Sequence, residues 1–151
     1  LMIRRPPRST LCISSAASDV YKRQEAELIP AMQKYGCGLL PYFPLASGLL
    51  TGKYKRTEMP EGARLTDMPT FANRIYLTDE NFDIVDNLNK FAHKTGHSIL
   101  ELAFGWMASR PTTASIIAGA TKPEQIDANV AAVNWVLSQS EIDEVNKISA
   151  R

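Results

Sequence analysis

The chain has 151 residues, of which 44% are hydrophobic and 22% charged, as in a single ordinary globular domain. No apolar run approaches the about 18 residues that a membrane-spanning helix needs. The 17 basic and 16 acidic side chains nearly cancel, and the basic excess lies in the first 24 residues, so the mildly acidic remainder disfavours a nucleic-acid-binding face.

Residues 1–24 differ from everything that follows. This segment, LMIRRPPRSTLCISSAASDVYKRQ, has no helical or strand period and a Pro6-Pro7 break. Its arginines and serines are typical of a transit peptide, but the prolines and scattered apolar residues make a poor amphipathic helix. The string resembles translated sequencing-adapter read-through at the ends of metagenomic gene fragments. We therefore expect a non-native, disordered segment over 1–24 and the native domain over 25–151.

Residues 25–77 predict a helix, a short strand and a long loop. Apolar residues on one helical face predict a helix over 25–36 that ends at Gly36, with Pro30 marking a later start or a kink. The run CGLLPY, 37–42, has the length and composition of a buried parallel strand. Glycines and prolines then punctuate residues 43–77, a loop long enough to act as a lid.

The next two predicted elements are helices. Thr78 is expected to cap a helix over 79–96. Ser98 is expected to cap a helix that is apolar almost all round, ends before Pro111 and is therefore buried. A second short strand, TASIIAG, is predicted over 113–119.

Two capping boxes are predicted beyond that strand. Thr121 with Glu124 would cap a helix over 122–133, and Ser140 with Asp143 a final helix over 141–149. Strands that alternate with helices indicate an α/β fold with a parallel sheet. Two strands can close neither a sheet nor a barrel, so we expect the chain to be the end of a larger α/β protein.

The segment after each predicted strand is a candidate ligand site, because ligands bind at the carboxyl ends of parallel strands. The first, PYFPLASGLLTGK, is not a P-loop. Three residues and not four separate Gly48 from Gly52, and Lys53 is followed by Tyr54.

The second segment, AGATKPEQIDAN, leads into a predicted helix. A helix N-terminus with the Thr121 hydroxyl and Lys122 would suit an anion. Gln125 and Asn129 would share one face of that helix at i, i+4 spacing. By spacing alone, an ordinary capped helix is an equally good interpretation.

As an ordered pair, YFPLASGLLTGKY and SIIAGATKPEQIDANVAA resemble the C-terminal part of the aldo-keto reductases. The resemblance covers residues 25–151 and implies about strands 7 and 8, with their helices, of a (β/α)8 TIM barrel. It implies NADP(H) as cofactor and hydride transfer that interconverts small aldehydes or ketones with alcohols. NAD(H) stays open, because only Lys122 and Arg64 are available for the 2′-phosphate. An unrelated barrel with a phosphate site is the weaker alternative, since the spacing of Gln125 and Asn129 argues against it.

The resemblance also implies the cofactor-binding positions. Tyr42 matches the aromatic residue that stacks on the nicotinamide, and Arg64 a loop arginine that reaches over the cofactor. The positions that line the pyrophosphate are Pro44, Leu45, Ala46, Gly48, Leu50 and Lys53. Those of the 2′-phosphate and adenine site are Gly119, Thr121, Lys122, Gln125 and Asn129. Phe43 stands where serine is usual and Ala128 where glutamate is frequent, so one cofactor hydrogen bond and one adenine contact of the family are not expected here.

In that family the acid tyrosine and its lysine, aspartate and histidine partners come from the first half of the barrel, so no catalytic residue is assigned here. We expect the parent protein to be an enzyme and this chain alone to be inactive and unstable. The alternative is a non-catalytic relative, because some members serve as cofactor-sensing subunits of potassium channels.

No further ligand class is expected. His93 and His97 lack a third metal ligand. Cys12 and Cys37 fit no metal or disulfide spacing, which favours a reducing, cytoplasmic compartment. Beyond a small carbonyl substrate, neither nucleic acid nor membrane is expected as a partner.

Overall fold

The structure is a computed structural model, and it describes residues 24–41, 43–67 and 76–150. The element order is η1 (Gln24–Leu28), α2 (Ile29–Tyr35), η2 (Ala46–Thr51), α3 (Arg64–Asp67), α5 (Asp79–Lys94), α6 (Ile99–Ala108), α7 (Pro123–Ala132) and α8 (Gln139–Ser149). None of the described helices is long and apolar enough to cross a bilayer. Tyr42 and nearly all of the segment predicted to be non-native lie outside these residues.

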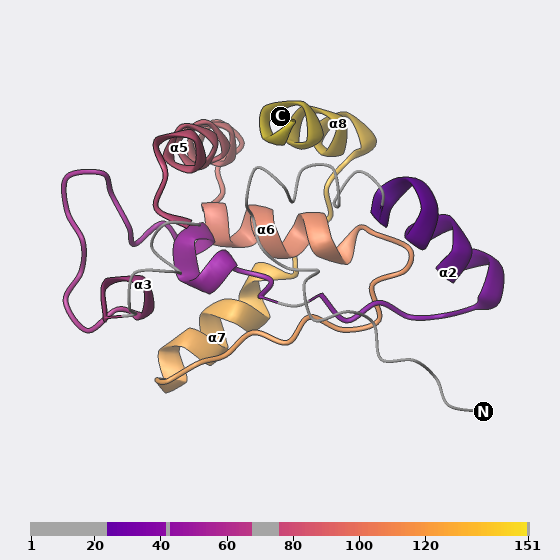
Figure 1. Cartoon of the computed structure of the whole chain (residues 1–151), viewed down its shortest axis with the longest axis horizontal. Coiled ribbons are helices and arrows are strands. Elements are labelled where there is room, and N and C mark those ends of the chain that lie inside the picture. Colours follow the sequence, from indigo (N-terminus) through magenta and orange to yellow (C-terminus); the bar gives the residue numbers. More distant parts are fainter. Residues whose placement is uncertain (1–23, 42, 68–75, 151) are drawn as a thin grey trace.

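Helix α6 is the element around which the others are arranged (Figure 1). α5, α7 and η2 each pack against it, and α8 packs against α5. The sequence of α6, ILELAFGWMA, is apolar on nearly every side, and Leu102, Phe104 and Met107 are buried. The prediction of a buried helix at this place is confirmed.

Side-chain caps fix where α5 and α6 begin. Thr78 Oγ1 accepts a hydrogen bond from the Asn81 N–H at 3.2 Å, and Ser98 Oγ accepts one from the Glu101 N–H at 3.2 Å. Glu101 accepts from the Ser98 N–H at 2.8 Å, which completes a capping box. Both predicted caps are confirmed.

The predicted Thr121–Glu124 capping box of α7 is wrong by one residue. Lys122 precedes the helix, and Gln125 occupies the third helical position. Gln125 Oε1 accepts from the N–H groups of Lys122 at 3.3 Å and of Thr121 at 2.7 Å. Pro123 suits the first helical position, because it has no N–H to satisfy there.

The predicted cap of α8 is displaced by two residues. Its N-cap is Ser138, whose N–H donates to Glu141 at 2.7 Å and whose hydroxyl accepts from the Glu141 N–H at 3.4 Å. The sequence SQSEID holds two overlapping serine–acid pairs, and Glu141 reaches back to a backbone N–H better than the shorter Asp143 of the predicted Ser140 pair.

The predicted N-terminal helix begins as a single π-helical turn, η1, and continues as α2. Pro30 cannot donate a backbone hydrogen bond, which is consistent with irregular helical bonding just before it. The helix ends at Gly36, as predicted, with a φ of 64° in the left-handed region.

The two predicted strands form one parallel bridge and no regular strand within the described part of the chain. Leu39 pairs with Thr113, its N–H donating to the Thr112 carbonyl at 2.6 Å and its carbonyl accepting from the Ala114 N–H at 2.9 Å. Gly38 permits the close approach, since a Cβ there would lie 2.6 Å from that of Ala114. The predicted parallel direction is present. The prediction of two regular strands is wrong for the described residues. A buried parallel strand needs a neighbouring strand at each edge, and here each segment has a neighbour at one edge only.

The predicted long loop over 43–77 contains local structure. Besides η2 and the single turn α3, Lys55 and Glu58 form an antiparallel bridge. Arg56 ties this turn to the start of α5 through Asp79, at 3.0 Å, and Asp83. These groups are exposed, so each pair contributes little to stability.

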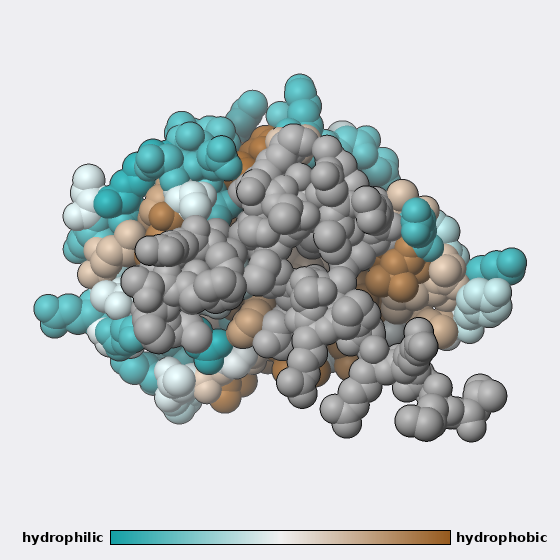
Figure 2. All heavy atoms as spheres, in the orientation of Figure 1, coloured by the Kyte–Doolittle hydropathy of each residue, from teal (hydrophilic) through white to brown (hydrophobic). Residues whose placement is uncertain are grey.

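Several large apolar side chains remain at the surface. Figure 2 shows brown surface in the regions of α2 and α7. The exposed large apolar residues are Leu28, Tyr35, Leu40, Ile117, Ile126, Val130, Val133 and Val136. Leu40 and Ile117 come from the two predicted strands, where a complete sheet would cover them.

Candidate functional site

A strained turn leads into η2. Phe43, Ala46 and Ser47 have φ values of 48°, 48° and 58°, and Gly48 follows at 95°. Within the described ranges, these three are the only residues other than glycine with positive φ. Left-handed backbone costs such residues roughly 1–2 kcal/mol each, so the surrounding structure must hold the turn in place. Strain of this kind concentrates at functional sites.

Hydrogen bonds and burial both fix this turn. The Ala46 N–H donates to the Phe43 carbonyl and the Gly48 N–H to the Leu45 carbonyl, both at 2.8 Å. Thr51 Oγ1 donates to the Gly48 carbonyl at 2.7 Å. Ala46 and Ser47 are both buried, so packing as well as hydrogen bonding holds the turn in place.

The other pyrophosphate-lining positions divide between core and surface. Leu50 packs against the hydrophobic core. Pro44 and Leu45 are half-buried in the turn. Lys53 is exposed, and its ammonium folds back over η2 toward Gly48.

Gly48 makes room for Lys53. A Cβ at position 48 would lie 3.1 Å from Lys53 Cε and 3.3 Å from Nζ. The same Nζ lies 5.0 Å from the centroid of the Tyr54 ring, within the range of a cation–π contact. The structure therefore brings these two predicted positions together.

Arg64 opens the short helix α3 and is exposed. The next residue, Leu65, is fully buried and donates its N–H to Tyr54 Oη at 2.9 Å. Tyr54 is itself 3% exposed. It thus lies between the segment that carries Lys53 and the segment that carries Arg64. Tyr54 was not predicted to take part in the site. The only indication in the sequence is that an aromatic residue directly follows Lys53.

The second group of predicted positions meets at the start of α7. Gln125 Oε1 accepts from the N–H and the hydroxyl of Thr121, at 2.7 and 3.2 Å, and from the Lys122 N–H. Gly119 is exposed beside them. The backbone donors expected to face an anion are thus engaged by Gln125, which is the arrangement of an ordinary capped helix. An anion would bind here by displacing the Gln125 carbonyl oxygen.

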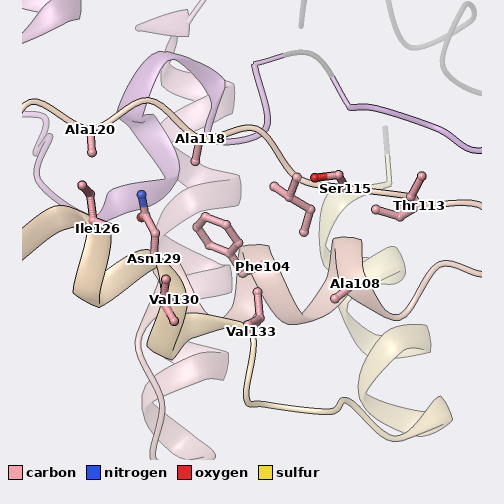
Figure 3. A pocket seen from close by; sticks show the side chains of 12 residues that line it. Phe104, Ala108, Thr113, Ser115, Ala118, Ala120, Ile126, Asn129, Val130 and Val133 are labelled. Carbon is pink, nitrogen blue, oxygen red and sulfur yellow. The ribbon is translucent and has the colours of Figure 1, made fainter.

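Asn129 lies apart from that cap. Its side chain points from α7 toward residues 118–120 and lines a cavity of about 460 Å³ (Figure 3). The cavity lies between residues 113–120, α6 and α7, and apolar side chains such as Phe104 and Val130 dominate its wall. It is a gap between layers of the fold and lacks the converging polar groups of a ligand site.

α6 supports both groups of predicted positions. η2 and α7 each pack against it, as Figure 1 shows. At its start, Ile99 is so close that a Cβ on Gly52 would lie 3.1 Å from Ile99 Cγ2. The relative position of the two groups therefore depends on this helix.

Among the described residues, two carboxyl groups have a lowered pKa, and both belong to helix caps. The backbone N–H of Ser98, then its hydroxyl and the His97 ring, lower the pKa of Glu101. The backbone N–H and hydroxyl of Ser138 lower that of Glu141. Hydrogen bonds to the charged form cause both shifts, so they indicate capping and not acid–base catalysis.

The two histidines have no metal-binding surroundings in the part of the chain that the structure describes, where no three His, Cys, Asp or Glu side chains cluster. His97 Nδ1 lies 3.2 Å from Glu101 Oε1. Its ring stacks on Trp135 with centroids 4.0 Å apart. These contacts join the start of α6 to the segment before α8.

A family model described as "Aldo/keto reductase family" matches residues 9–150. The match begins within the segment expected to be non-native, and the boundary at residue 25 stays a prediction. Among curated relatives, a "Probable voltage-gated potassium channel subunit beta" of Oryza sativa subsp. japonica is 38% identical over 128 residues, 82% of this chain and 39% of the relative. An "NADH-specific methylglyoxal reductase" of Escherichia coli (strain K12) is 33% identical over 133 residues, 85% of this chain and 39% of the relative.

A solved structure is also similar. The glycerol dehydrogenase AKR11B4 from Gluconobacter oxydans matches with a TM-score of 0.66 and 26% identity, over 91% of this chain and 47% of that one. This likeness supports an α/β fold for a chain whose described elements are helices. The chain spans about two fifths of the length of the curated relatives above.

Proposed function

The chain belongs to the aldo/keto reductase family, and from that membership we propose that it is the cofactor-holding, C-terminal part of an NADP(H)-dependent oxidoreductase. The reaction would interconvert a small aldehyde or ketone with its alcohol. Two similar proteins carry the names of a methylglyoxal reductase and a glycerol dehydrogenase, which supports a small carbonyl or alcohol substrate. A cytoplasmic location belongs to the same proposal.

The observation that carries the proposal is the strained turn that brings Lys53 over Gly48. Arg64 is exposed one residue from the hydrogen bond between Leu65 and Tyr54. One exposed cation over a glycine-containing turn, and a second at the start of the helix that packs against η2, suit the charged oxygens of a diphosphate. The donor set therefore fits a dinucleotide.

When bound, the nicotinamide would accept or supply the hydride. Lys53 would neutralise the pyrophosphate, with Pro44, Leu45, Ala46, Gly48 and Leu50 shaping the turn beside it. Arg64 would reach over the dinucleotide, and Tyr42 would stack on its nicotinamide.

The start of α7 would hold the other end of the cofactor. Thr121 and Lys122 would contact the 2′-phosphate, with Gly119 leaving room and Gln125 exchanging its backbone partners for the ligand. Asn129 would contact the adenine. Among the described tyrosines, Tyr54 is an unsuitable proton donor to a substrate, because it is 3% exposed.

The barrel assignment is a further part of the proposal. Residues 37–42 and 113–119 would be strands 7 and 8 of a (β/α)8 barrel, and other strands would cover Leu40 and Ile117. Their exposure, the single parallel bridge and the share of the relatives that the chain spans support this. A barrel of this kind places its ligand at the carboxyl ends of the strands.

A cofactor-sensing subunit without catalytic activity is the second candidate. Three similar proteins are named as probable or putative potassium channel β subunits, at 36–38% identity. The residues that would hold the dinucleotide serve both functions. Sequencing the locus upstream of the Glu25 codon, followed by assay of small aldehydes with the complete reading frame, separates them: turnover supports the reductase, and binding without turnover supports the sensor.

Nucleotide titration tests the cofactor assignment. NADPH and NADH are added to the protein encoded by the complete reading frame, and binding is followed by the fluorescence of the reduced nicotinamide. We expect NADPH to bind more tightly, and Lys122→Gln to weaken NADPH by roughly tenfold while changing NADH little, because one charge contact to the 2′-phosphate is lost. Lys147→Gln, an exposed lysine on α8, is the matched control. If the complete protein binds neither nucleotide, the assignment is wrong.

A further inference from the structure

Tyr54 joins two segments that both carry candidate cofactor residues. It directly follows Lys53 in the chain, and its hydroxyl contacts the backbone next to Arg64. The ring is 3% exposed and the Leu65 side chain is fully buried, so this contact lies inside the protein. η2 and α3 also pack against each other.

The Tyr54 hydroxyl accepts a hydrogen bond from the Leu65 N–H, which has no acceptor within helix α3. The first N–H groups of a helix have no intrahelical acceptor. In α3, the N–H groups of Thr66 and Asp67 donate to the Ala63 carbonyl, both at 2.9 Å, whereas the Leu65 N–H donates to Tyr54 Oη. A buried N–H that loses its partner is costly, so without the hydroxyl the start of α3 would move until Leu65 found another acceptor.

The Tyr54 ring acts on the other segment. Lys53 Nζ lies 5.0 Å from the ring centroid, and Tyr54 Cε2 lies 3.5 Å from the position that a Cβ on Gly48 would take. The ring therefore supports both the ammonium group and the glycine beneath it. One side chain contacts the lysine through its face and the arginine segment through its hydroxyl.

We infer that Tyr54 is a positioning residue that holds Lys53 and Arg64 in one arrangement for the phosphates of a dinucleotide. The inference rests on the proposed function. Tyr54 itself touches no part of the ligand in this account. Its effect reaches the ligand through Lys53, which contacts its ring, and through Arg64, which lies next to the Leu65 N–H that donates to its hydroxyl.

The first test measures the contact alone. Amide hydrogen exchange of the 151-residue chain is followed by NMR in trimethylamine-N-oxide, which favours compact states. Tyr54→Phe should speed exchange of the Leu65 amide about tenfold, because that N–H loses its acceptor. Tyr35→Phe removes the same hydroxyl from a side chain that is 74% exposed, and should leave Leu65 unchanged.

If Tyr54→Phe does not fold, amide exchange in the unmodified chain still tests the contact between Tyr54 and Leu65. The Leu65 amide should exchange much more slowly than that of Gly62, which is exposed in the same loop. Equal rates at the two positions would overturn the inference, as would a Leu65 rate that Tyr54→Phe leaves unchanged.

The second test asks whether Tyr54 acts through Arg64. NADPH affinity is measured for the protein encoded by the complete reading frame, unmodified and as the Tyr54→Phe, Arg64→Gln and double variants. Tyr54→Phe should weaken binding about fivefold on its own and hardly at all in the Arg64→Gln background, since the cation it places is gone. A general loss of structure would weaken binding equally in both backgrounds, and that result contradicts the inference.

Different results would overturn the proposed function and the inference about Tyr54. If the unmodified complete protein binds no dinucleotide, the proposed function is wrong and the inference falls with it. If it binds NADPH and its Tyr54→Phe variant binds equally well, only the inference is wrong.

Discussion

Gly48 combines an unusual backbone conformation with a close side-chain neighbour. Its φ of 95° suits glycine, and Lys53 fills the space that a Cβ would take. We expect Gly48→Ala to destabilise the chain by about 1–3 kcal/mol and to weaken nucleotide binding, because both the backbone and Lys53 must shift. Urea unfolding and nucleotide titration of the protein encoded by the complete reading frame measure the two effects, and the unfolding comparisons of other variants below use the same protein.

Gly36→Ala separates these causes. Gly36 also has positive φ, 64°, but nothing lies within 4 Å of the position of its Cβ. Its alanine variant should therefore show the backbone cost of about 1 kcal/mol and unchanged nucleotide affinity. Equal loss of affinity in both variants would mean that Lys53 is not placed by Gly48.

Glu101 makes the stability of α6 dependent on pH. Its pKa is lowered from the ordinary 4.5, chiefly by the Ser98 N–H. A carboxyl with a lower pKa in the folded state stabilises that state above the unfolded value and loses this contribution as the pH falls through the folded value. We expect stability to decline below about pH 4.5, and Glu101→Gln, which can still accept the cap hydrogen bond, to reduce that decline. Denaturant unfolding of both proteins between pH 7 and 3 checks this, and equal slopes would contradict it.

At the scale of elements, two serines compete to cap α8: Ser138, which caps it in the structure, and Ser140, which the sequence predicted. Ser138→Ala should cost about 1 kcal/mol, because the capping box with Glu141 is lost. Ser140→Ala is the matched control and should cost little, since its hydroxyl contacts only that of Ser138 among the hydrogen bonds described. Thermal or urea unfolding of the two variants decides which serine is the cap. A larger loss of stability in Ser140→Ala than in Ser138→Ala would favour the predicted cap.

Gly105, in the middle of α6, should respond to substitution by alanine in the opposite way to a glycine in an exposed helix. In an exposed helix, glycine to alanine stabilises by about 1 kcal/mol. A Cβ on Gly105 would lie 2.5 Å from Leu137 Cδ1 and 2.6 Å from the Trp135 carbonyl oxygen. Gly105→Ala should therefore destabilise by about 1–3 kcal/mol in urea unfolding. Leu137→Ala in the same chain should relieve only part of the clash, because the carbonyl oxygen remains.

Helices were easier to predict than strands for a physical reason. Thr78, Ser98 and Gly36 act on residues within one helical turn of themselves, so the sequence contains nearly all of the signal. Leu39 forms its bridge with Thr113, far along the chain, and the length of a strand depends on neighbours that the sequence of that segment does not encode.

The candidate site divides in the same way. The glycine and lysine of its turn are visible in the sequence, but the strained φ of Ala46 and Ser47 and the reach of Tyr54 to Leu65 depend on tertiary packing. The engagement of Thr121 and Lys122 by Gln125 depends on a one-residue choice of register.

For the whole molecule, exposed apolar surface should lower stability. Leu40 is 56% and Ile117 66% exposed, and a cavity lies between α6, α7 and residues 113–120. We expect residues 25–151 alone to unfold without a sharp transition and to bind a hydrophobic dye before denaturant is added. Circular dichroism through a urea titration and dye fluorescence measure this. A soluble preparation with one cooperative transition would contradict the expectation.

The bridge between Leu39 and Thr113 also has a consequence for the order of events in the cell. Ribosomes release the chain from its N-terminus, so residues 37–40 emerge well before residues 112–114 have been made. During that interval the earlier segment has an open backbone edge and the exposed side chain of Leu40. Such edges pair readily with other chains. The interval between the synthesis of the two halves of the bridge is therefore one in which residues 37–40 are open to pairing with other chains.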